Sequence, residues 1–227
     1  MFACNIQAQF RLQGSTELGH TNVSEGMYLR SLVKGTYSIE QLSFRLAFQN
    51  ELISHNSSFF SGLNMGANYH FKIKTYPLQG ELFFLQNVLN NYVTERNYIG
   101  SISTNAQKLN ATLGLGFKTI GFTSYARKQA GINTNKSISE IFNLIYDINY
   151  SFLNPESAWK LKIGISNIDE FTVNQATNPM TFVSARYNLS DKLELVTDVC
   201  YKTAGAFNLH VNYYGFYIRP GIIWKIN

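Results

Sequence analysis

Apolar and polar residues alternate one by one along most of this chain. Between residues 63 and 73 every odd-numbered position is apolar (Leu, Met, Ala, Tyr, Phe, Ile), and every even-numbered position is polar or glycine. Because successive side chains of a β-strand point to opposite faces, this period of two predicts a strand with one apolar and one polar face.

The same alternation predicts about twelve strands in the whole chain. The clearest lie at 42–49, 63–73, 109–117, 142–152, 159–166 and 216–226, and weaker ones at 10–18, 27–37, 78–88, 122–127, 181–189 and 193–202. Apolar residues spaced by three and four positions, the pattern of an amphipathic helix, are nearly absent. We therefore expect an all-β protein.

The predicted connections between these strands alternate in length. Short turns rich in turn-forming residues are expected at 38–41, 74–77, 118–121, 153–157 and 189–192. Longer polar loops are expected at 19–26, 50–59, 89–106, 128–139, 167–179 and 203–209. Short turns at one end, long loops at the other and an even number of strands are the pattern of a transmembrane β-barrel.

Composition favours a membrane barrel over a soluble β-protein. The chain is only 15% charged and as much as 15% aromatic, whereas soluble proteins average about 25% charged residues. A lipocalin-like barrel or a β-sandwich would carry charges on its outer face for solubility. The mean hydropathy of −0.12 and the lack of an apolar run near ~20 residues exclude a helical membrane protein. The abundance of Phe and Tyr excludes a disordered chain.

Together with these strands and turns, the closing segment Tyr217-Ile-Arg-Pro-Gly-Ile-Ile-Trp-Lys-Ile-Asn227 resembles bacterial outer-membrane β-barrel proteins. The resemblance covers nearly the whole chain, although Asn227 stands where such proteins usually end on an aromatic residue. It implies a closed antiparallel up-and-down barrel of about 12 strands in the outer membrane of a Gram-negative bacterium. Its partners would be membrane lipid and the outer-membrane assembly machinery, and the oligomeric state stays open.

The barrel is expected to form one domain over residues 10–227. Residues 1–9, which close on Ala8-Gln9, resemble the end of an export signal as found in Bacteroidetes. The alternative is that they begin the first strand. Cys4 and Cys200 lie too far apart in sequence to form a dense disulfide framework, and we interpret both as packing residues.

If the apolar faces meet lipid, the polar faces line the lumen, and their charges become the functional evidence. The predicted lumen residues along an anion path are Arg11, Arg30, Lys34, Arg45, Lys72, Lys108, Arg127, Lys160, Lys162, Arg186 and Arg219. Lys202 and Lys225 also point inward, against the acids Glu17, Glu51, Glu81, Asp147, Glu194 and Asp198. An excess of basic groups in a narrow pore lowers the barrier for anions. The layout is also similar to twelve-stranded porins for acidic oligosaccharides, so we expect a narrow porin-like channel for small anionic solutes.

A plugged barrel is the first alternative. Inward acids and bases that pair with one another would fill and rigidify the lumen, since an unpaired charge there is costly. Such a barrel would act as an anchor, an adhesin or a subunit of an outer-membrane complex. The loops at 89–106 and 167–179 either fold inward as a constriction or outward as a binding surface.

A hydrolase at the rim is the second alternative. His20 and His210 lie at the loop ends of the first and last strands, and Glu17 and Ser24 are close to His20 in sequence. A histidine base oriented by a carboxylate is conceivable there, although no serine accompanies His210. The four histidines lack metal-ligand spacing, no glycine-rich loop opens a helix, and basic residues form no surface patch, so we expect no metal, cofactor or nucleic acid.

Overall fold

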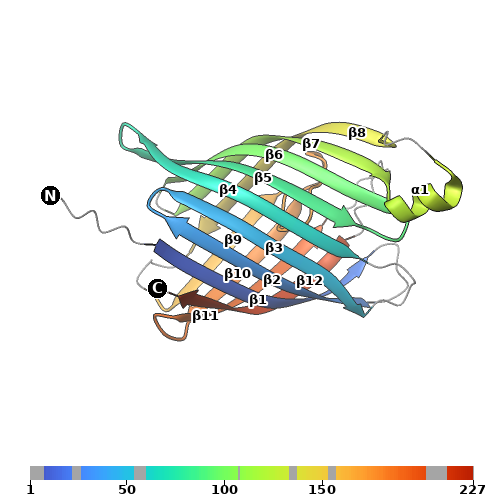
Figure 1. Cartoon of the computed structure of the whole chain (residues 1–227). Coiled ribbons are helices and arrows are strands. Elements are labelled where there is room, and N and C mark those ends of the chain that lie inside the picture. The colour runs from blue at the N-terminus through green and yellow to red at the C-terminus, as the bar shows by residue number, and fades with distance from the viewer. Residues whose placement is uncertain are drawn as a thin grey trace.

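The computed structural model describes residues 8–21, 27–53, 60–106, 108–132, 137–152, 157–202 and 214–226. In these ranges the chain forms twelve strands and one short helix (Figure 1). The strands are β1 (Ala8–Thr21), β2 (Met27–Ile39), β3 (Leu42–Ile53), β4 (Ser61–Ile73), β5 (Tyr76–Val88), β6 (Val93–Ala106), β7 (Leu109–Phe122), β8 (Ser139–Ser151), β9 (Trp159–Ser166), β10 (Met180–Asn188), β11 (Leu193–Lys202) and β12 (Tyr214–Ile226).

Each strand pairs antiparallel with its neighbours in sequence, and β1 pairs with β12 to close the barrel. The closing register runs from Phe10 opposite Ile226 to Thr21 opposite Tyr214. The predicted fold class, a closed up-and-down barrel of about twelve strands, is confirmed. No helix among the described residues is long and apolar enough to cross a membrane.

The predicted number of strands is right although three of the predictions behind it are wrong. The loop expected at 89–106 is mostly β6, and the turn expected at 118–121 lies inside β7. In β6 the alternation is hidden because polar residues occupy both faces: Glu95 is buried inside, while Arg96 lies exposed outside and donates to Gln86 at 3.1 Å. In β7 the inward Lys118 and Ile120 are both buried.

The strand expected at 122–127 is also wrong, because β7 ends at Phe122 and the helix α1 (Ser124–Ala130) follows. Thr123 caps the helix: its hydroxyl accepts from the amide of Ala126 at 3.1 Å. Gly131 ends it in the left-handed conformation, with φ of 64°. Arg127 therefore lies on the helix α1, which extends beyond the end of the barrel wall (Figure 1), and its assignment to the lumen is wrong.

The connections sort to the two ends of the barrel. The turns after β2, β4, β6, β8 and β10 lie at the end where β1 begins and β12 finishes (Figure 1). We call this the short-turn end and the opposite one the long-loop end. Glu40 and Lys74 adopt positive φ, at 51° and 56°, in the two-residue turns after β2 and β4.

Outward aromatic side chains form a row at each end of an apolar band. Toward the long-loop end, a row of residues in direct register across β5 to β8 consists of Phe84, Tyr98, Phe117 and Phe142. The next row toward the loops is polar: Gln86, Arg96, Thr119 and Glu140. Toward the short-turn end, the exposed aromatic residues include Phe10, Tyr37, Tyr69, Tyr150, Trp159 and Trp224, and the rings of Trp159 and Tyr187 lie 4.7 Å apart. Two aromatic girdles around an apolar belt are the exterior of a membrane barrel.

Candidate functional site: the barrel lumen

The connection between β9 and β10 folds into the barrel. This inner loop, residues 167–179, leaves the wall where Ser166 lies opposite Met180. A bridge between Ile168 and Val173 folds its first half into a small hairpin. Of the two positions predicted for this loop, the structure shows the inward one.

Aromatic and aliphatic side chains hold the tip of the inner loop. Phe171 and Val173 are each only 1% exposed. They belong to what we call the apolar lumen cluster, whose wall members are Leu32, Ala47, Phe60, Phe83, Leu85, Ile99 and Ile145. The expectation that apolar residues face lipid alone is wrong at these inward positions, because the inner loop gives them a surface on which to pack.

Wall side chains also hold the backbone of the inner loop. Asn64 donates to the carbonyl of Glu170 at 2.6 Å, and Asn87 donates to that of Phe171 at 2.7 Å. The ammonium of Lys118 donates to the carbonyl of Val173 at 2.6 Å. These three donors lie on β4, β5 and β7, so they satisfy carbonyl groups that no sheet partner reaches.

Two ion pairs fix the acidic residues of the inner loop. Arg219 binds Asp169 with both terminal nitrogens, at 2.8 and 3.3 Å, and Lys34 binds Glu170 at 2.9 Å. Burial raises the pKa of Asp169, but the positive charge of Arg219 and hydrogen bonds outweigh it and leave that pKa below its usual value. Burial also raises the pKa of Glu170, but the charges of Lys34 and Arg45 lower it by more, so the pKa of Glu170 is below its usual value as well.

Charges alternate around the inner wall in what we call the charge belt. Following neighbouring strands from β9 to β3, its members are Lys162, Ser184, Asp198, Arg219, Glu17, Arg30 and Glu51. Arg30 lies 3.6 Å from both Glu17 and Glu51, and the Nε of Arg219 lies 2.9 Å from Glu17. Most basic groups of this belt thus have acidic neighbours, as the plugged-barrel alternative expects.

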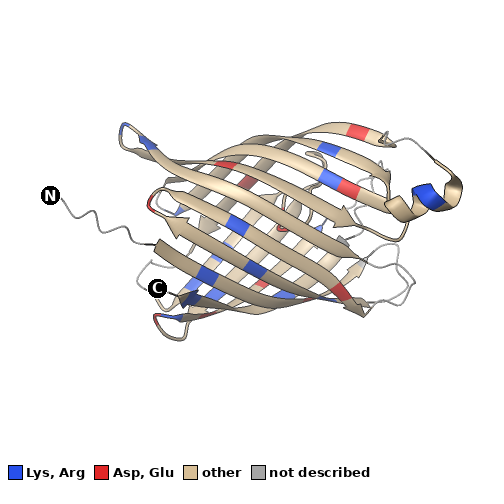
Figure 2. Ribbon diagram, viewed as in Figure 1, with Lys and Arg blue, Asp and Glu red and all other residues tan. Residues whose placement is uncertain are grey.

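Basic residues gather at the short-turn end. In the registers of the sheet, Arg11 lies directly opposite Lys225, and Lys160 directly opposite Arg186. One buried acid forms an ion pair with one member of each of these two pairs: Glu194 lies 3.4 Å from Arg186 and 3.3 Å from Lys225. We call these four cations the basic mouth; Figure 2 shows basic positions beside the C-terminus. Like charges directly across a strand pair destabilise a sheet.

A polar cavity of about 210 Å³ lies in the lumen beside the inner loop. Its charged lining residues are Lys34, Asp147, Lys162, Asp169, Glu170, Arg186, Asp198 and Arg219. Four are basic and four are acidic, so the basic excess expected along the whole lumen is concentrated instead at the basic mouth.

The structure separates the predicted lumen residues into three groups. Those that line the inside of the wall are Arg30, Lys34, Arg45, Lys162, Arg186 and Arg219. Those exposed near the short-turn end are Arg11, Lys72, Lys108 and Lys160, with Lys108 in the turn itself. Arg127 lies on α1, as described above.

Several lumen residues were missed by the sequence analysis. Lys118 forms a buried ion pair with Glu95 at 3.2 Å, but these residues fell in a predicted turn and a predicted loop. Asp169 and Glu170 lie in a loop whose direction has no local signal. The one signal that could have placed Lys118 in the lumen is the alternation of β7, which continues through Lys118 and Ile120.

Of the residues considered for a hydrolase at the rim, the structure describes His20 and Glu17. His20 is exposed on the outer face of β1, and Glu17 points inward to Arg219 and Arg30, so the proposed orientation of His20 by Glu17 is wrong. Ser24 and His210 lie outside the described residues, as does Cys4. Cys200 is a buried free thiol. No group of His, Cys, Asp and Glu suited to a metal ion occurs in the described part of the chain.

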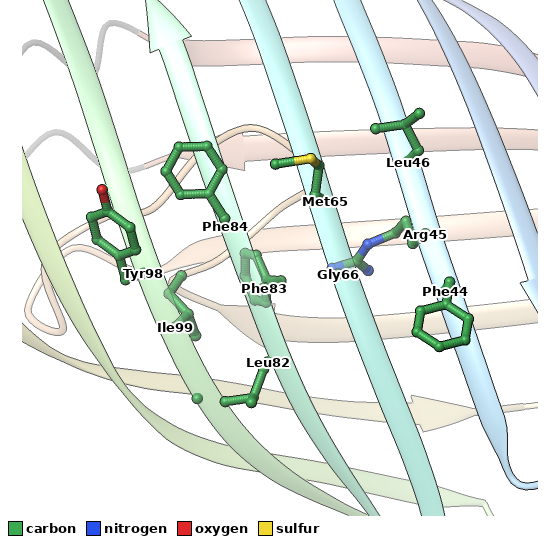
Figure 3. A pocket seen from close by; sticks show the side chains of 11 residues that line it. Phe44, Arg45, Leu46, Met65, Gly66, Leu82, Phe83, Phe84, Tyr98 and Ile99 are labelled. Carbon is green, nitrogen blue, oxygen red and sulfur yellow. The ribbon is translucent and has the colours of Figure 1, made fainter.

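The outer wall carries a shallow groove over β3 to β6 (Figure 3). Its outward lining residues are Phe44, Leu46, Met65, Leu82, Phe84 and Tyr98. On the same strands Arg45 and Phe83 turn their side chains to the lumen, where Arg45 lies 2.7 Å from Glu81. The groove is therefore part of the lipid-facing belt, separated from the lumen by the wall.

Comparisons with known proteins support this architecture. No protein-family model and no curated protein sequence matches the chain. Among solved structures, it is similar to the KdgM porin, with a TM-score of 0.54 and 10% identity over 96% of this chain and 99% of that one. It is also similar to the COG4313 outer membrane channel from Pseudomonas putida F1, with a TM-score of 0.53 and 10% identity over 99% and 97% of the two chains.

A third similar structure is the translocator domain of the autotransporter NalP from Neisseria meningitidis, with a TM-score of 0.51 and 10% identity over 96% of this chain and 88% of that one. At such identities the likeness concerns the fold. The closed wall, the two aromatic girdles and these likenesses together identify the chain as a bacterial outer-membrane β-barrel protein.

Proposed function

We propose that the protein is a narrow, gated channel for small anionic solutes, with the inner loop as its gate. The observation that carries this proposal is the basic mouth, in which Arg11 opposes Lys225 and Lys160 opposes Arg186. Two like-charged pairs cost stability in a sheet. A positive potential that draws anions into a narrow entrance is a function that accounts for this cost.

The inner loop suits a gate because one segment closes the lumen and most of its polar contacts are exchangeable. Its ion pairs to Arg219 and Lys34 and its hydrogen bonds from Asn64 and Asn87 can all be replaced by water. The loop joins the wall only where β9 ends and β10 begins. Swinging it aside would leave the twelve-stranded wall intact.

The experiment is planar-bilayer recording of the refolded protein under a salt gradient. The double variant Asp169→Asn/Glu170→Gln weakens the gate and should raise conductance, with a reversal potential that shows anion preference. Adding Arg11→Gln and Lys160→Gln should move the reversal potential toward zero. Lys192→Gln, an exposed cation in the turn after β10, is the matched control and should leave it unchanged. Cation preference would contradict the proposal.

A permanently plugged barrel is the second candidate, and the apolar lumen cluster favours it. Seven inward wall side chains pack around Phe171 and Val173, and such packing resembles a solid protein core more than a pore lining. Under this reading the barrel acts as an anchor, an adhesin or a subunit of a complex. It predicts that the double variant stays silent in bilayers while losing thermal stability.

A further inference from the structure

We infer that the inner loop occupies a binding site of its own barrel, in which Asp169, Glu170 and Phe171 stand in for a solute that joins a carboxylate to an apolar group. This inference rests on the proposed function and names the class of anion. The three residues are consecutive, and the wall holds each by a different chemistry.

The charged half of the site is built for carboxylates. The guanidinium of Arg219 meets the Asp169 carboxylate with two nitrogens on two oxygens, at 2.8 and 3.3 Å. Such a two-point contact is the geometry by which arginine recognises carboxylates specifically. The ammonium of Lys34, 2.9 Å from Glu170, adds a second cation on β2.

The apolar half of the site is built for a ring or a short hydrocarbon chain. The Phe171 side chain lies against Gly62, where a Cβ atom would come within 2.7 Å of the ring. The apolar lumen cluster encloses its other sides, and the ring is buried. A lumen that passes only hydrated inorganic ions has no use for such a pocket, since water-filled pores are lined by polar groups.

One contact of the inner loop is incomplete, which suits a replaceable occupant. The Oε1 atom of Glu170 is buried and has no hydrogen-bond partner. An unsatisfied buried carboxylate oxygen costs free energy. A free solute that places its single carboxylate against Arg219 or Lys34 would avoid this cost, because it is not tied to a backbone.

The polar cavity supplies the approach to this site. Asp169 and Glu170 line it together with Lys34, Arg186 and Arg219. Arg186 also belongs to the basic mouth, so it connects the cations of the short-turn end with those of the cavity, where Asp147 and Asp198 lie between them and the inner loop has its own carboxylates. A solute would enter with its carboxylate on these cations and reach the apolar lumen cluster as the loop withdraws.

The test uses the variant Asp169→Asn/Glu170→Gln/Phe171→Ala, which keeps the length of the loop but removes the side chains that imitate the solute. The probes are 3-phenylpropionate, acetate, which has the carboxylate alone, and 3-phenylpropanol, which has the apolar group alone. We expect 3-phenylpropionate to halve the chloride current of the variant at a concentration roughly tenfold or more below that of either other probe. Adding Lys34→Gln should weaken this block, and adding Lys192→Gln should not.

The thermal stability of the same variant provides a readout that does not require conduction. We expect 3-phenylpropionate to raise its unfolding temperature more than acetate or 3-phenylpropanol does, and to have a smaller effect on the unaltered protein, whose site is filled. Equal effects of the three probes would overturn the inference while leaving a conducting channel intact. A silent variant that is still stabilised selectively by 3-phenylpropionate would instead contradict only the proposed channel.

Discussion

At the scale of single residues, the packing of the inner loop against the wall requires one missing side chain. Gly62 faces inward on β4, and only the absence of a Cβ atom lets the Phe171 ring lie against the wall there. An added Cβ atom would also lie 3.1 Å from the side-chain oxygen of Asn87, whose amide nitrogen donates to the carbonyl of Phe171. The wall and the loop are therefore fitted to each other at this point with no spare volume.

Gly62→Ala should unseat the inner loop. Overpacking of this kind costs about 1–3 kcal/mol, which corresponds to roughly 5- to 150-fold in the equilibrium between the closed and open loop. Single-channel recording should show a higher open probability. Gly14→Ala is the control, because a Cβ atom at Gly14 meets nothing within 4 Å; equal behaviour of the two variants would show that the fit at Gly62 is unimportant.

At the scale of elements, the inner loop exists because β9 and β10 are short. They span 8 and 9 residues, whereas β8 spans 13, so β8 pairs with β9 only from Asp147 to Ser151 and the rest of that edge has no strand partner. Asn167 takes the place of that strand: its amide donates to the carbonyl of Leu144 at 2.6 Å and accepts from the amide of Tyr146 at 2.8 Å. One side chain thus continues the hydrogen bonding of the sheet where the chain turns inward.

Asn167→Ala should destabilise the barrel by about 1–3 kcal/mol, because it removes the partners of the Leu144 carbonyl and the Tyr146 amide in the partly buried wall. Urea unfolding of the protein in lipid vesicles measures the loss. Asn105→Ala, at an exposed position of β6 near its turn, is the matched control and should change stability little. A loss no larger than that of the control would remove the role given to Asn167.

The contacts of the inner loop also predict how the proposed gate responds to acid. The pKa values of Asp169 and Glu170 lie below the ordinary 3.8 and 4.5, for the reasons given above. The charged groups near these two carboxylates are the cations Arg219, Lys34 and Arg45 and the acids Glu17 and Asp147. A lowered pKa means that the ion pairs contribute their full stability above the ordinary values and lose it as the pH falls through the lowered ones.

Conductance should therefore be constant at neutral pH and rise only in acid, below about pH 4. The rise should be absent in Asp169→Asn/Glu170→Gln, which has no carboxylate to protonate in the loop. Recordings across a pH series on both proteins check this. A rise centred near neutral pH would mean that another group controls the loop.

At the scale of the whole molecule, the barrel has two differently lined halves. The charge belt runs over β9 to β12 and β1 to β3, whereas most wall members of the apolar lumen cluster lie on β2 to β6. Outside, aromatic girdles bound the lipid-facing band. A soluble barrel would place its apolar residues inside only, so the exposed Phe, Leu and Ile of the outer wall require a membrane.

Tryptophan fluorescence tests this placement. Trp159 and Trp224 are the two tryptophans of the chain, both exposed on the outer wall near the short-turn end. Lipids brominated close to the head group should quench their emission more strongly than lipids brominated near the chain ends. Trp224→Phe should keep the same depth profile from Trp159 alone. Lack of quenching by any brominated lipid would contradict a membrane position.

The sequence by itself determined the class of fold and the outward face. The alternation in β4 is dense enough to specify a strand without any knowledge of its neighbours, because side-chain direction along a strand is a local property. It failed at β6 and at the end of β7, where inward positions carry Glu95, Lys118 and Ile120 in no simple pattern. The strand missed at β6 and the strand wrongly expected at 122–127 cancelled in the number of strands.

Only the tertiary structure decided what fills the lumen. Asp169 meets Arg219, and Glu170 meets Lys34, across 50 and 136 positions of the chain. The composition gives the number of basic residues but does not show which of them form ion pairs with acids. Whether a loop turns inward depends on surfaces supplied by distant strands, such as the space over Gly62, and such long-range fits leave no periodic trace in the sequence.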